Sequence, residues 1–184
     1  MRVCGLVLAA GAGSRFGMPK GLARTADGTP WVATAVGMLR DGGCEDVVVL
    51  VGASADEVAS LVPAGARVER VPGWRDGLAA TLRAGLAAVA DGEWDVAVIT
   101  PVDTPDAPAA AVARVLGAVR SGAPLAQARY DGAPGHPVAI ARTHFAALSA
   151  ALKGDRGARP YLVANGVAEI ECADLWSGAD IDER

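Results

Sequence analysis

The chain begins with the run Met1-Arg2-Val3-Cys4-Gly5-Leu6-Val7-Leu8-Ala9-Ala10-Gly11-Ala12-Gly13-Ser14-Arg15-Phe16-Gly17-Met18-Pro19-Lys20. Within it, residues 3–9 form an almost unbroken apolar stretch, which predicts a strand buried on both faces of a sheet. The stretch leads directly into a glycine-rich loop that carries two cations, Arg15 and Lys20. Because ligands of open α/β sheets bind beyond the carboxyl ends of the strands, this loop is the first candidate for a binding site.

Apolar runs and helical patterns alternate through the rest of the chain. Further strands are predicted over residues 46–51 and 94–99 and, on either side of a turn at Asp131-Gly132, over 124–130 and 137–141. Helices are predicted from Thr29, a cap before a first-turn proline, to about Arg40, and over residues 54–63, 77–90, 107–119 and 143–152. The alternation predicts an α/β fold: a single Rossmann-like, doubly wound, mostly parallel sheet with helices on both faces, formed by residues 1–184 as one domain.

The composition excludes several classes of function. The net charge of −4 argues against a general nucleic-acid binder, which would carry a basic stripe. No apolar run reaches the roughly 18 residues that span a bilayer, and the first residues do not match a secretory signal, so no membrane partner is expected. Cys4, Cys44 and Cys172 lack paired spacing, which favours reduced thiols in a cytoplasmic protein.

The glycine-rich loop has the chemistry of a phosphate site. Glycines let backbone N–H groups converge on an anion, and the two cations of the loop lie within reach of one nucleoside triphosphate. The dinucleotide-binding fingerprint does not match, because its third glycine position is occupied by Phe16. The Walker pattern does not match either, because Gly17 is followed by Met18. The residues therefore point to a triphosphate loop of another kind.

Residues 8–20 resemble the signature L-A-A-G-x-G-x-R-x-G-x-P-K of the sugar-nucleotide and molybdenum-cofactor nucleotidyltransferases. Other segments are similar to the molybdenum-cofactor cytidylyltransferase branch of that superfamily. Residues 71–82 resemble its N-x-x-W-x-x-G-M-S-S-S-L, 101–105 its P-C-D-Q-P, 135–137 its G-H-P, 154–159 its G-D-x-G-A-R and 180–182 its D-I-D ending. The matches follow the order of the family over nearly the whole chain, which would make it a nucleotidyltransferase domain.

The resemblance implies that a nucleoside monophosphate is transferred from a triphosphate, CTP in this branch, to the terminal phosphate of a molybdopterin acceptor. Pyrophosphate would be released, and Mg²⁺ would be the cofactor. Asp103 follows a buried strand and lies among prolines, so it is the predicted Mg²⁺ ligand, with Asp180 or Asp182 as the second. The alternatives are that Asp103 caps the following helix and that the two later acids belong to a solvated tail.

The resemblance also assigns the two substrates to particular residues. Arg15, Lys20 and Asp103 are the predicted catalytic residues. Nucleotide-binding residues are predicted to be Ala9, Ala10, Gly11, Ala12, Gly13, Arg15, Lys20 and Gly77. The acceptor is predicted to contact His136, Arg156 and Arg159, and a molybdoenzyme or its chaperone is a further expected partner. The competing interpretations are a plain helix start at Gly77, a turn histidine and solvated arginines.

Several positions depart from the family pattern and keep alternatives open. Leu78-Ala79-Ala80 replaces Met-Ser-Ser and removes two hydroxyls, and Thr104 stands where glutamine is common. A GTP-dependent guanylyltransferase for molybdopterin or another phosphorylated cofactor precursor is one alternative, although Ala10 favours the cytidylyl branch over enzymes that carry glycine there. Two other classes are a dinucleotide-dependent oxidoreductase and a non-catalytic nucleotide-binding protein.

Overall fold

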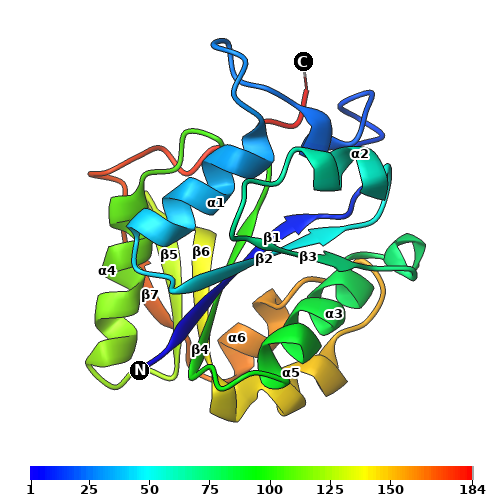
Figure 1. Cartoon of the computed structure of the whole chain (residues 1–184). Helices are drawn as coiled ribbons and strands as arrows, with labels where there is room; N and C mark the ends of the chain where they lie inside the picture. Colours follow the sequence, from blue (N-terminus) through cyan, green and yellow to red (C-terminus); the bar gives the residue numbers. More distant parts are fainter. Residues whose placement is uncertain (184) are drawn as a thin grey trace.

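A seven-stranded sheet crosses the molecule in the order β3-β2-β1-β4-β6-β5-β7 (Figure 1). This computed structural model describes residues 1–183. The strands are β1 (Val3–Ala9), β2 (Asp46–Val51), β3 (Arg67–Arg70), β4 (Val96–Pro101), β5 (Leu125–Tyr130), β6 (Ala133–Ala141) and β7 (Ala168–Glu171). All neighbouring pairs are parallel except those of β6, which runs antiparallel to both β4 and β5. The predicted doubly wound, mostly parallel sheet is therefore confirmed.

Helices cover both faces of this sheet, as predicted (Figure 1). They are α1 (Trp31–Asp41), α2 (Ala55–Ser60), α3 (Leu78–Ala90), α4 (Ala109–Arg120), α5 (Phe145–Ala151) and α6 (Arg159–Ala164), with 3-10 turns η1 (Lys20–Leu22), η2 (Trp74–Asp76) and η3 (Arg142–His144). Helices α1, α2 and α4 contribute to the core on one face, and α3, α5 and α6 to the core on the other. None of the helices formed by residues 1–183 is both long enough and apolar enough to cross a membrane.

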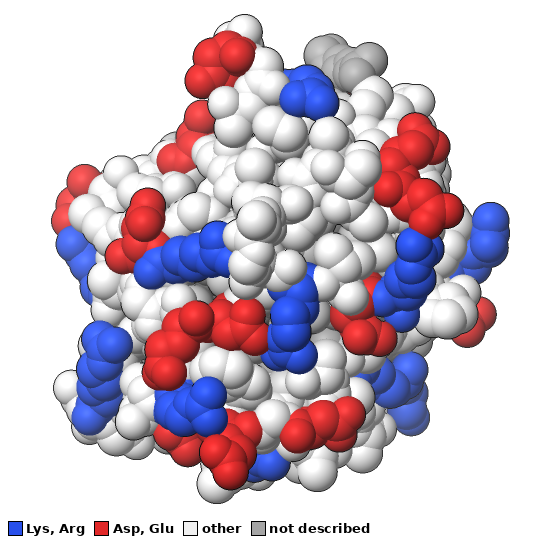
Figure 2. Space-filling view, in the orientation of Figure 1, with Lys and Arg blue, Asp and Glu red and all other residues white. Residues whose placement is uncertain are grey.

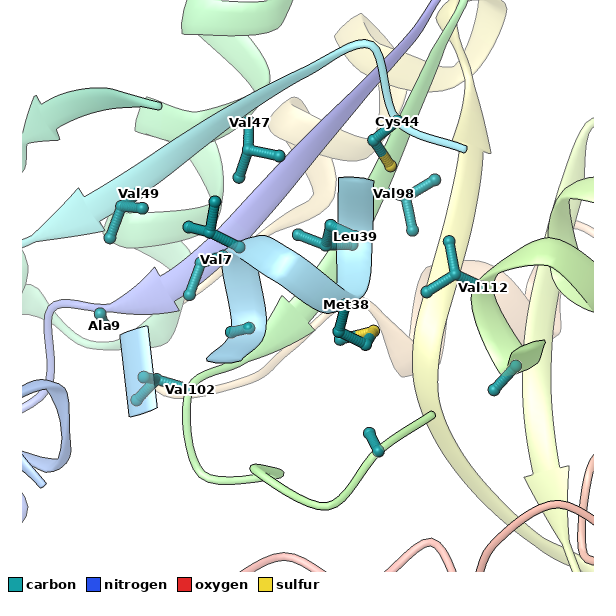
Figure 3. Close-up of a cluster of buried hydrophobic side chains, with 14 of the residues drawn as sticks. Val7, Ala9, Met38, Leu39, Cys44, Val47, Val49, Val98, Val102 and Val112 are labelled. Atoms are coloured by element: carbon teal, nitrogen blue, oxygen red, sulfur yellow. The ribbon is translucent and has the colours of Figure 1, made fainter. Parts of the chain in front are cut away.

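Small aliphatic side chains build the core between α1, α4 and the sheet. Figure 3 shows Leu39 and Met38 of α1 pointing towards the valines of three strands, with Val112 of α4 beside them. Leu39 is fully buried, and the full burial of one such side chain stabilises the fold by about 1.5–3 kcal/mol. The buried aromatic residues Phe16, Trp31 and Tyr130 belong to the same core.

The helix starts needed corrections of one or two residues. Pro30 was predicted to be the first helical residue of α1, but its backbone is extended (ψ 136°) and the helix begins at Trp31. The reason is that Thr29 closes a turn, since its carbonyl accepts a hydrogen bond from the Thr25 amide at 2.9 Å. The turn at Asp131-Gly132 is confirmed: both residues have positive φ, and β5 and β6 form the hairpin around it.

Three elements were not predicted from the sequence: β3, α6 and β7. Every residue of β3 is exposed, and its sequence Arg-Val-Glu-Arg gives no apolar alternation. Strand β7 and helix α6 are short, at four and six residues. Weak local patterns of this length are decided by pairing with a neighbouring strand, which for β3 is β2 and for β7 is β5.

The connections place a switch point between β1 and β4. From β1 the chain builds β2 and β3 on one side, then returns to place β4 on the other side of β1. Two chain segments therefore diverge at the carboxyl ends of these neighbouring strands, which is where open α/β sheets bind ligands. The glycine-rich loop follows β1 at this edge, and Asp103 follows β4.

Candidate active site

A cleft of about 640 Å³ opens at this edge of the sheet. Its walls come from the loop after β1, from η2 and the start of α3, from the residues after β4, and from the C-terminal segment. Every residue predicted to bind the nucleotide lines this cleft: Ala9, Ala10, Gly11, Ala12, Gly13, Arg15, Lys20 and Gly77. Segments that are far apart in the sequence thus meet in one place.

The glycine-rich loop turns back on itself before it reaches η1. The amide of Gly17 donates to the carbonyl of Gly13 at 2.9 Å, and Gly13 has a positive φ of 62°. A side chain at Gly13 would overlap the backbone of Met18, so this position requires glycine. The turn carries Arg15 at its exposed tip and Lys20 at its base, where the lysine points into the cleft.

Lys20 lies between two carboxylates. Its Nζ donates to Oδ2 of Asp103 at 2.7 Å and to Oδ1 of Asp182 at 2.9 Å, and its side chain is only 15% exposed. Burial lowers the pKa of Lys20, but the hydrogen bonds and charges of Asp103 and Asp182 outweigh it and raise this pKa above its ordinary value. The hydrogen bond and charge of Lys20, with the charge of Arg15, hold the pKa of Asp182 below its ordinary value. Asp182 is therefore held in the ionised form that a cation requires.

Asp103, Asp180 and Asp182 form a cluster in which one ligand atom of each lies within 4.8 Å of the others. The carboxylate oxygen Oδ1 of Asp103 is buried and has no hydrogen-bond partner among residues 1–183. A buried, unpaired carboxylate oxygen is costly in a folded protein, so it marks a position where a ligand would complete the coordination. Hard oxygen donors of this kind fit Mg²⁺ or Mn²⁺.

The opposite wall of the cleft is formed by η2 and the start of α3. The guanidinium carbon of Arg75 lies 4.4 Å from the centre of the Trp74 ring, so the two side chains are stacked. Leu78 is 37% exposed and presents an apolar surface to the cleft. Ala79 and Ala80 have no hydroxyl group where the family pattern has serines. Thr81, the next residue, does carry a hydroxyl and lines the cleft.

Gly77, directly before α3, packs against the loop 153–157. It has φ of 97°, and a Cβ there would lie 2.7 Å from the backbone of Gly154. The amide of Ala79 donates to the carbonyl of Gly154 at 2.9 Å, and the Asp155 carboxylate lies against Gly77 and lines the cleft. The start of α3 is therefore occupied by groups of this chain, and the close packing explains why glycine stands at position 77.

His136 also lines the cleft, at the start of the part of β6 that pairs with β4. Burial lowers the pKa of His136 despite the opposing effect of the Asp103 and Asp180 charges, so the imidazole is neutral at pH 7. Its backbone carbonyl accepts a hydrogen bond from the Tyr130 hydroxyl at 2.7 Å. The predicted acceptor residue is thus present, as a neutral hydrogen-bonding group.

The two arginines predicted to hold the acceptor phosphate do not line this cleft, so the structure does not bring them together with the other predicted site residues. Arg159 donates to Gln127 at 2.6 Å and to Glu169 at 2.8 Å, so its guanidinium is engaged on the β5–β7 side of the sheet. Arg156 lines a separate hollow of about 70 Å³ next to α5 and α6. The reason is that the loop 153–157 turns Asp155, rather than its arginine, towards the cleft.

Comparison with known proteins decides the family. A model of the MobA-like NTP transferase domain matches residues 5–169. This chain belongs to the MobA-like NTP transferase family. The fold and the cleft described above are therefore those of a nucleotidyltransferase family, and homologues in it carry out more than one named activity.

Two curated relatives of this MobA-like chain have different names. The nicotine blue oxidoreductase of Paenarthrobacter nicotinovorans is 33% identical over an alignment of 193 positions, covering 98% of this chain and 92% of the relative. The molybdenum cofactor guanylyltransferase of Burkholderia vietnamiensis strain G4 is 33% identical over an alignment of 182 positions, covering 94% and 87%. A crystal structure of Rv0371C of Mycobacterium tuberculosis in complex with manganese is 26% identical, with a TM-score of 0.77, covering 94% of this chain and 88% of that one.

Several cleft residues of the MobA-like domain were not among the predicted site residues, including Trp74, Arg75, Thr81 and Asp155. Trp74 and Asp155 each lie in a segment that resembles a family motif, so the sequence held a signal for both. Thr81 stands at the last serine of the motif that residues 71–82 resemble, so the sequence held a signal for it too. Arg75 stands at an unspecified position of that motif, and only the fold shows that it faces the cleft. Figure 2 shows that cations and acids are interspersed over the face it presents, without a broad stripe of one sign.

Proposed function

We propose that residues 1–184 act as a single nucleotidyltransferase domain that moves CMP from CTP to the terminal phosphate of a pterin-type molybdenum cofactor and releases pyrophosphate. One observation carries this proposal: the glycine-rich loop, Lys20 and a cluster of three carboxylates meet in one cleft. The free thiols at positions 4, 44 and 172 support a reducing, cytoplasmic location.

The reaction needs positioning and charge neutralisation more than proton transfer. An oxygen of the acceptor phosphate forms a bond to the α-phosphorus of the triphosphate, and the bond from that phosphorus to pyrophosphate breaks. Because the second pKa of a phosphate monoester is about 6, the attacking oxygen is already largely ionised at pH 7. A neutral His136 is compatible with this chemistry, because it is not required as a general base.

The acidic cluster would hold the divalent cation through Asp103, Asp180 and Asp182. When bound, Mg²⁺ neutralises phosphate charge that develops as the pyrophosphate leaves. Lys20 keeps Asp103 and Asp182 close together, and it can donate to phosphate oxygens once a cation shares those carboxylates. Arg15, whose side chain is 79% exposed, is free to fold over the triphosphate because its contact with Asp182 is long, at 3.5 Å. The manganese complex of a 26% identical neighbour supports a divalent metal in this family.

The proposal also names the two substrates, the nucleotide and the acceptor. The motif resemblance favours CTP, whereas the relative from Burkholderia supports GTP as the alternative, with molybdopterin as the acceptor in both cases. A molybdoenzyme or its chaperone would receive the product. The stacked Trp74 and Arg75 offer an aromatic face and a cation beside the nucleotide loop, a surface suited to a planar heterocycle.

A pyrophosphate-release assay tests the proposal. The purified protein is incubated with molybdopterin, Mg²⁺ and either CTP, GTP, ATP or UTP, and pyrophosphate and the dinucleotide product are measured. We expect release with CTP that is abolished by EDTA. Release with GTP alone would replace the cytidylyl assignment by the guanylyl one. Triphosphate binding without pyrophosphate release for any nucleotide would indicate a non-catalytic binding protein.

A second candidate function is supported by the relative from Paenarthrobacter, which is named an oxidoreductase and aligns with 98% of this chain. In that case the cleft would bind a reduced dinucleotide, and a hydride would pass to an aromatic acceptor. Oxidation of NADH or NADPH in the presence of nicotine blue, followed at 340 nm or by loss of the blue colour, tests this. Turnover there, with no pyrophosphate release from any triphosphate, would overturn the transferase proposal.

A further inference from the structure

Tyr130, at the end of β5, contacts two segments that line the cleft although it does not line the cleft itself. Its side chain is buried, with 4% of the residue exposed. The ring packs edge-on against Trp176, with 5.4 Å between ring centres, and its hydroxyl donates to the His136 carbonyl at 2.7 Å. Burial raises the pKa of the Tyr130 hydroxyl, so this group stays protonated and remains a donor.

Glycines allow both segments to approach the Tyr130 ring. A Cβ at Gly178 would lie 2.8 Å from the Tyr130 Cβ and closer still to its ring, and a Cβ at Gly135 would lie 2.7 Å from the ring. Gly178 also has a positive φ of 77°, which a side chain would strain. The ring therefore lies between the β6 hairpin and the C-terminal segment, in contact with the backbone of both.

The C-terminal segment, residues 173–183, depends on such contacts for its position because it contains no helix or strand. It carries Asp180 and Asp182 to the cleft, where the amide of Ile181 donates to the Asp103 carbonyl at 2.9 Å. In Figure 1 this segment ends beside η1, on the far side of the molecule from the N-terminus. Trp176 and Gly178, the residues in contact with Tyr130, lie four and two residues before Asp180.

We propose that Tyr130 is a positioning residue for the acidic cluster, because its ring clamps the C-terminal segment so that Asp180 and Asp182 face Asp103. The proposal rests on the proposed function in so far as these carboxylates bind a divalent cation. The hydroxyl has a different role, because its hydrogen bond holds the His136 backbone at the cleft. Ring and hydroxyl can therefore be tested separately.

Two substitutions separate the ring from the hydroxyl. Tyr130→Leu removes the edge-on contact with Trp176, so the C-terminal segment loosens and the three carboxylates no longer preorganise a site. Tyr130→Phe keeps the ring and removes only the hydrogen bond to His136. Phe145→Leu is the matched control, because Phe145 is an aromatic residue with the same 4% exposure that packs in the core on the opposite face of the sheet.

Two measurements on the full chain decide the proposal. One is the dissociation constant of Mn²⁺ alone, followed by electron paramagnetic resonance. The other is hydrogen exchange of the peptide containing the Ile181 amide, measured without metal. For Tyr130→Leu we expect Mn²⁺ binding weakened about 10-fold or more, the size seen when outer-shell residues of metal sites are replaced, and faster exchange at Ile181. Tyr130→Phe and Phe145→Leu should change neither quantity by more than about 2-fold, whatever their melting temperatures.

The outcomes distinguish failure of the positioning role of Tyr130 from failure of the proposed function. Unchanged exchange at Ile181 and unchanged Mn²⁺ affinity in Tyr130→Leu would overturn the positioning role. If the wild-type chain binds no Mn²⁺, the metal site is removed from the proposed function. Hydrogen exchange at Ile181 is then the only measurement that tests the positioning role of Tyr130. If Tyr130→Leu does not fold, Gly178→Ala replaces it, because a methyl group there displaces the segment without opening the core; unchanged exchange and affinity in that variant overturn the proposal.

Discussion

Asp103 has one carboxylate oxygen bound to Lys20 and the other buried without a partner among residues 1–183. Asp103→Asn should therefore remove the charge that a divalent cation needs, while the side chain keeps its shape. Because loss of an outer-shell partner alone costs 10–100-fold in metal sites, we expect at least about a 100-fold loss of Mn²⁺ affinity and of pyrophosphate release. Asp106→Asn, on the exposed side of the same loop, is the control and should retain both.

Lys20 neutralises two carboxylates, so its loss should increase the thermal stabilisation that a bound divalent cation gives the protein. Without metal, Lys20→Met leaves Asp103 with no cation partner and Asp182 with only the longer contact to Arg15, and we expect the free energy of unfolding to fall by about 2 kcal/mol. A bound divalent cation can replace the lost charge, so Mn²⁺ should raise the melting temperature more in Lys20→Met than in the wild type. Thermal unfolding in EDTA and in Mn²⁺ measures this. Lys153→Met, outside the cleft, is the control, and equal Mn²⁺ shifts in Lys20→Met and wild type would contradict the prediction.

At the level of secondary structure, the elements predictable from the sequence were those with strong local patterns. β1 and β2 are continuous apolar runs, and α3 places apolar residues at helical spacing, so burial and periodicity agreed. β3 gave no signal, because an exposed edge strand is formed by backbone pairing with β2 rather than by burial of its side chains. Helix boundaries shifted where a neighbouring turn competed for the same residues, as at Thr29 and Pro30.

The start of α3 depends on Gly77 as a junction between two segments. Gly77→Ala would strain a positive φ and press a methyl group against Gly154, so we expect a loss of about 2 kcal/mol in the free energy of unfolding. The displaced loop 153–157 should also weaken nucleotide binding, because Asp155 lines the cleft. Gly117→Ala in α4 is the matched control. Its Cβ would meet open space within a helix, and the variant should be more stable by up to about 1 kcal/mol. Urea denaturation compares the two, and a Gly77→Ala protein as stable as wild type would show that the junction tolerates a side chain.

At the level of the whole molecule, the order of the elements and the motif resemblance predicted which segments of the chain meet at the site. They predicted that Lys20, Asp103, Asp180 and Asp182 lie in one region, although more than 150 residues separate the first from the last. The direction in which a surface side chain points was not predictable, because it is set by partners that only the fold supplies. Arg159, at the start of α6, shows this, since Gln127 and Glu169 hold it away from the cleft.

Global burial also sets the reactivity of the three thiols. Cys4, Cys44 and Cys172 are all buried, and burial raises the pKa of Cys4 to about 11 and of Cys44 to about 12. Burial likewise raises the pKa of Cys172. A raised pKa keeps a thiol protonated and unreactive, so the native protein should react slowly with Ellman's reagent at pH 8, and all three thiols should react at once in urea. A rapid reaction of one equivalent in the native state would show that one of these sites opens locally.

From the charge of the cleft we expect nucleotide binding to depend on a divalent metal. Three cations and four acids line it: Arg15, Lys20, Arg75, Asp103, Asp155, Asp180 and Asp182. Lys20 is already neutralised by two of these acids, and the chain as a whole carries a charge of −4, so a metal-free triphosphate meets net repulsion. We expect CTP or GTP to bind at least about 10-fold more weakly in EDTA than in Mg²⁺, a difference of about 1.4 kcal/mol, measured by isothermal titration calorimetry. Asp103→Asn in Mg²⁺ should behave as the wild type does in EDTA. Equal affinity with and without metal would mean that Arg15 and Arg75 alone hold the phosphates and that the acidic cluster serves another purpose.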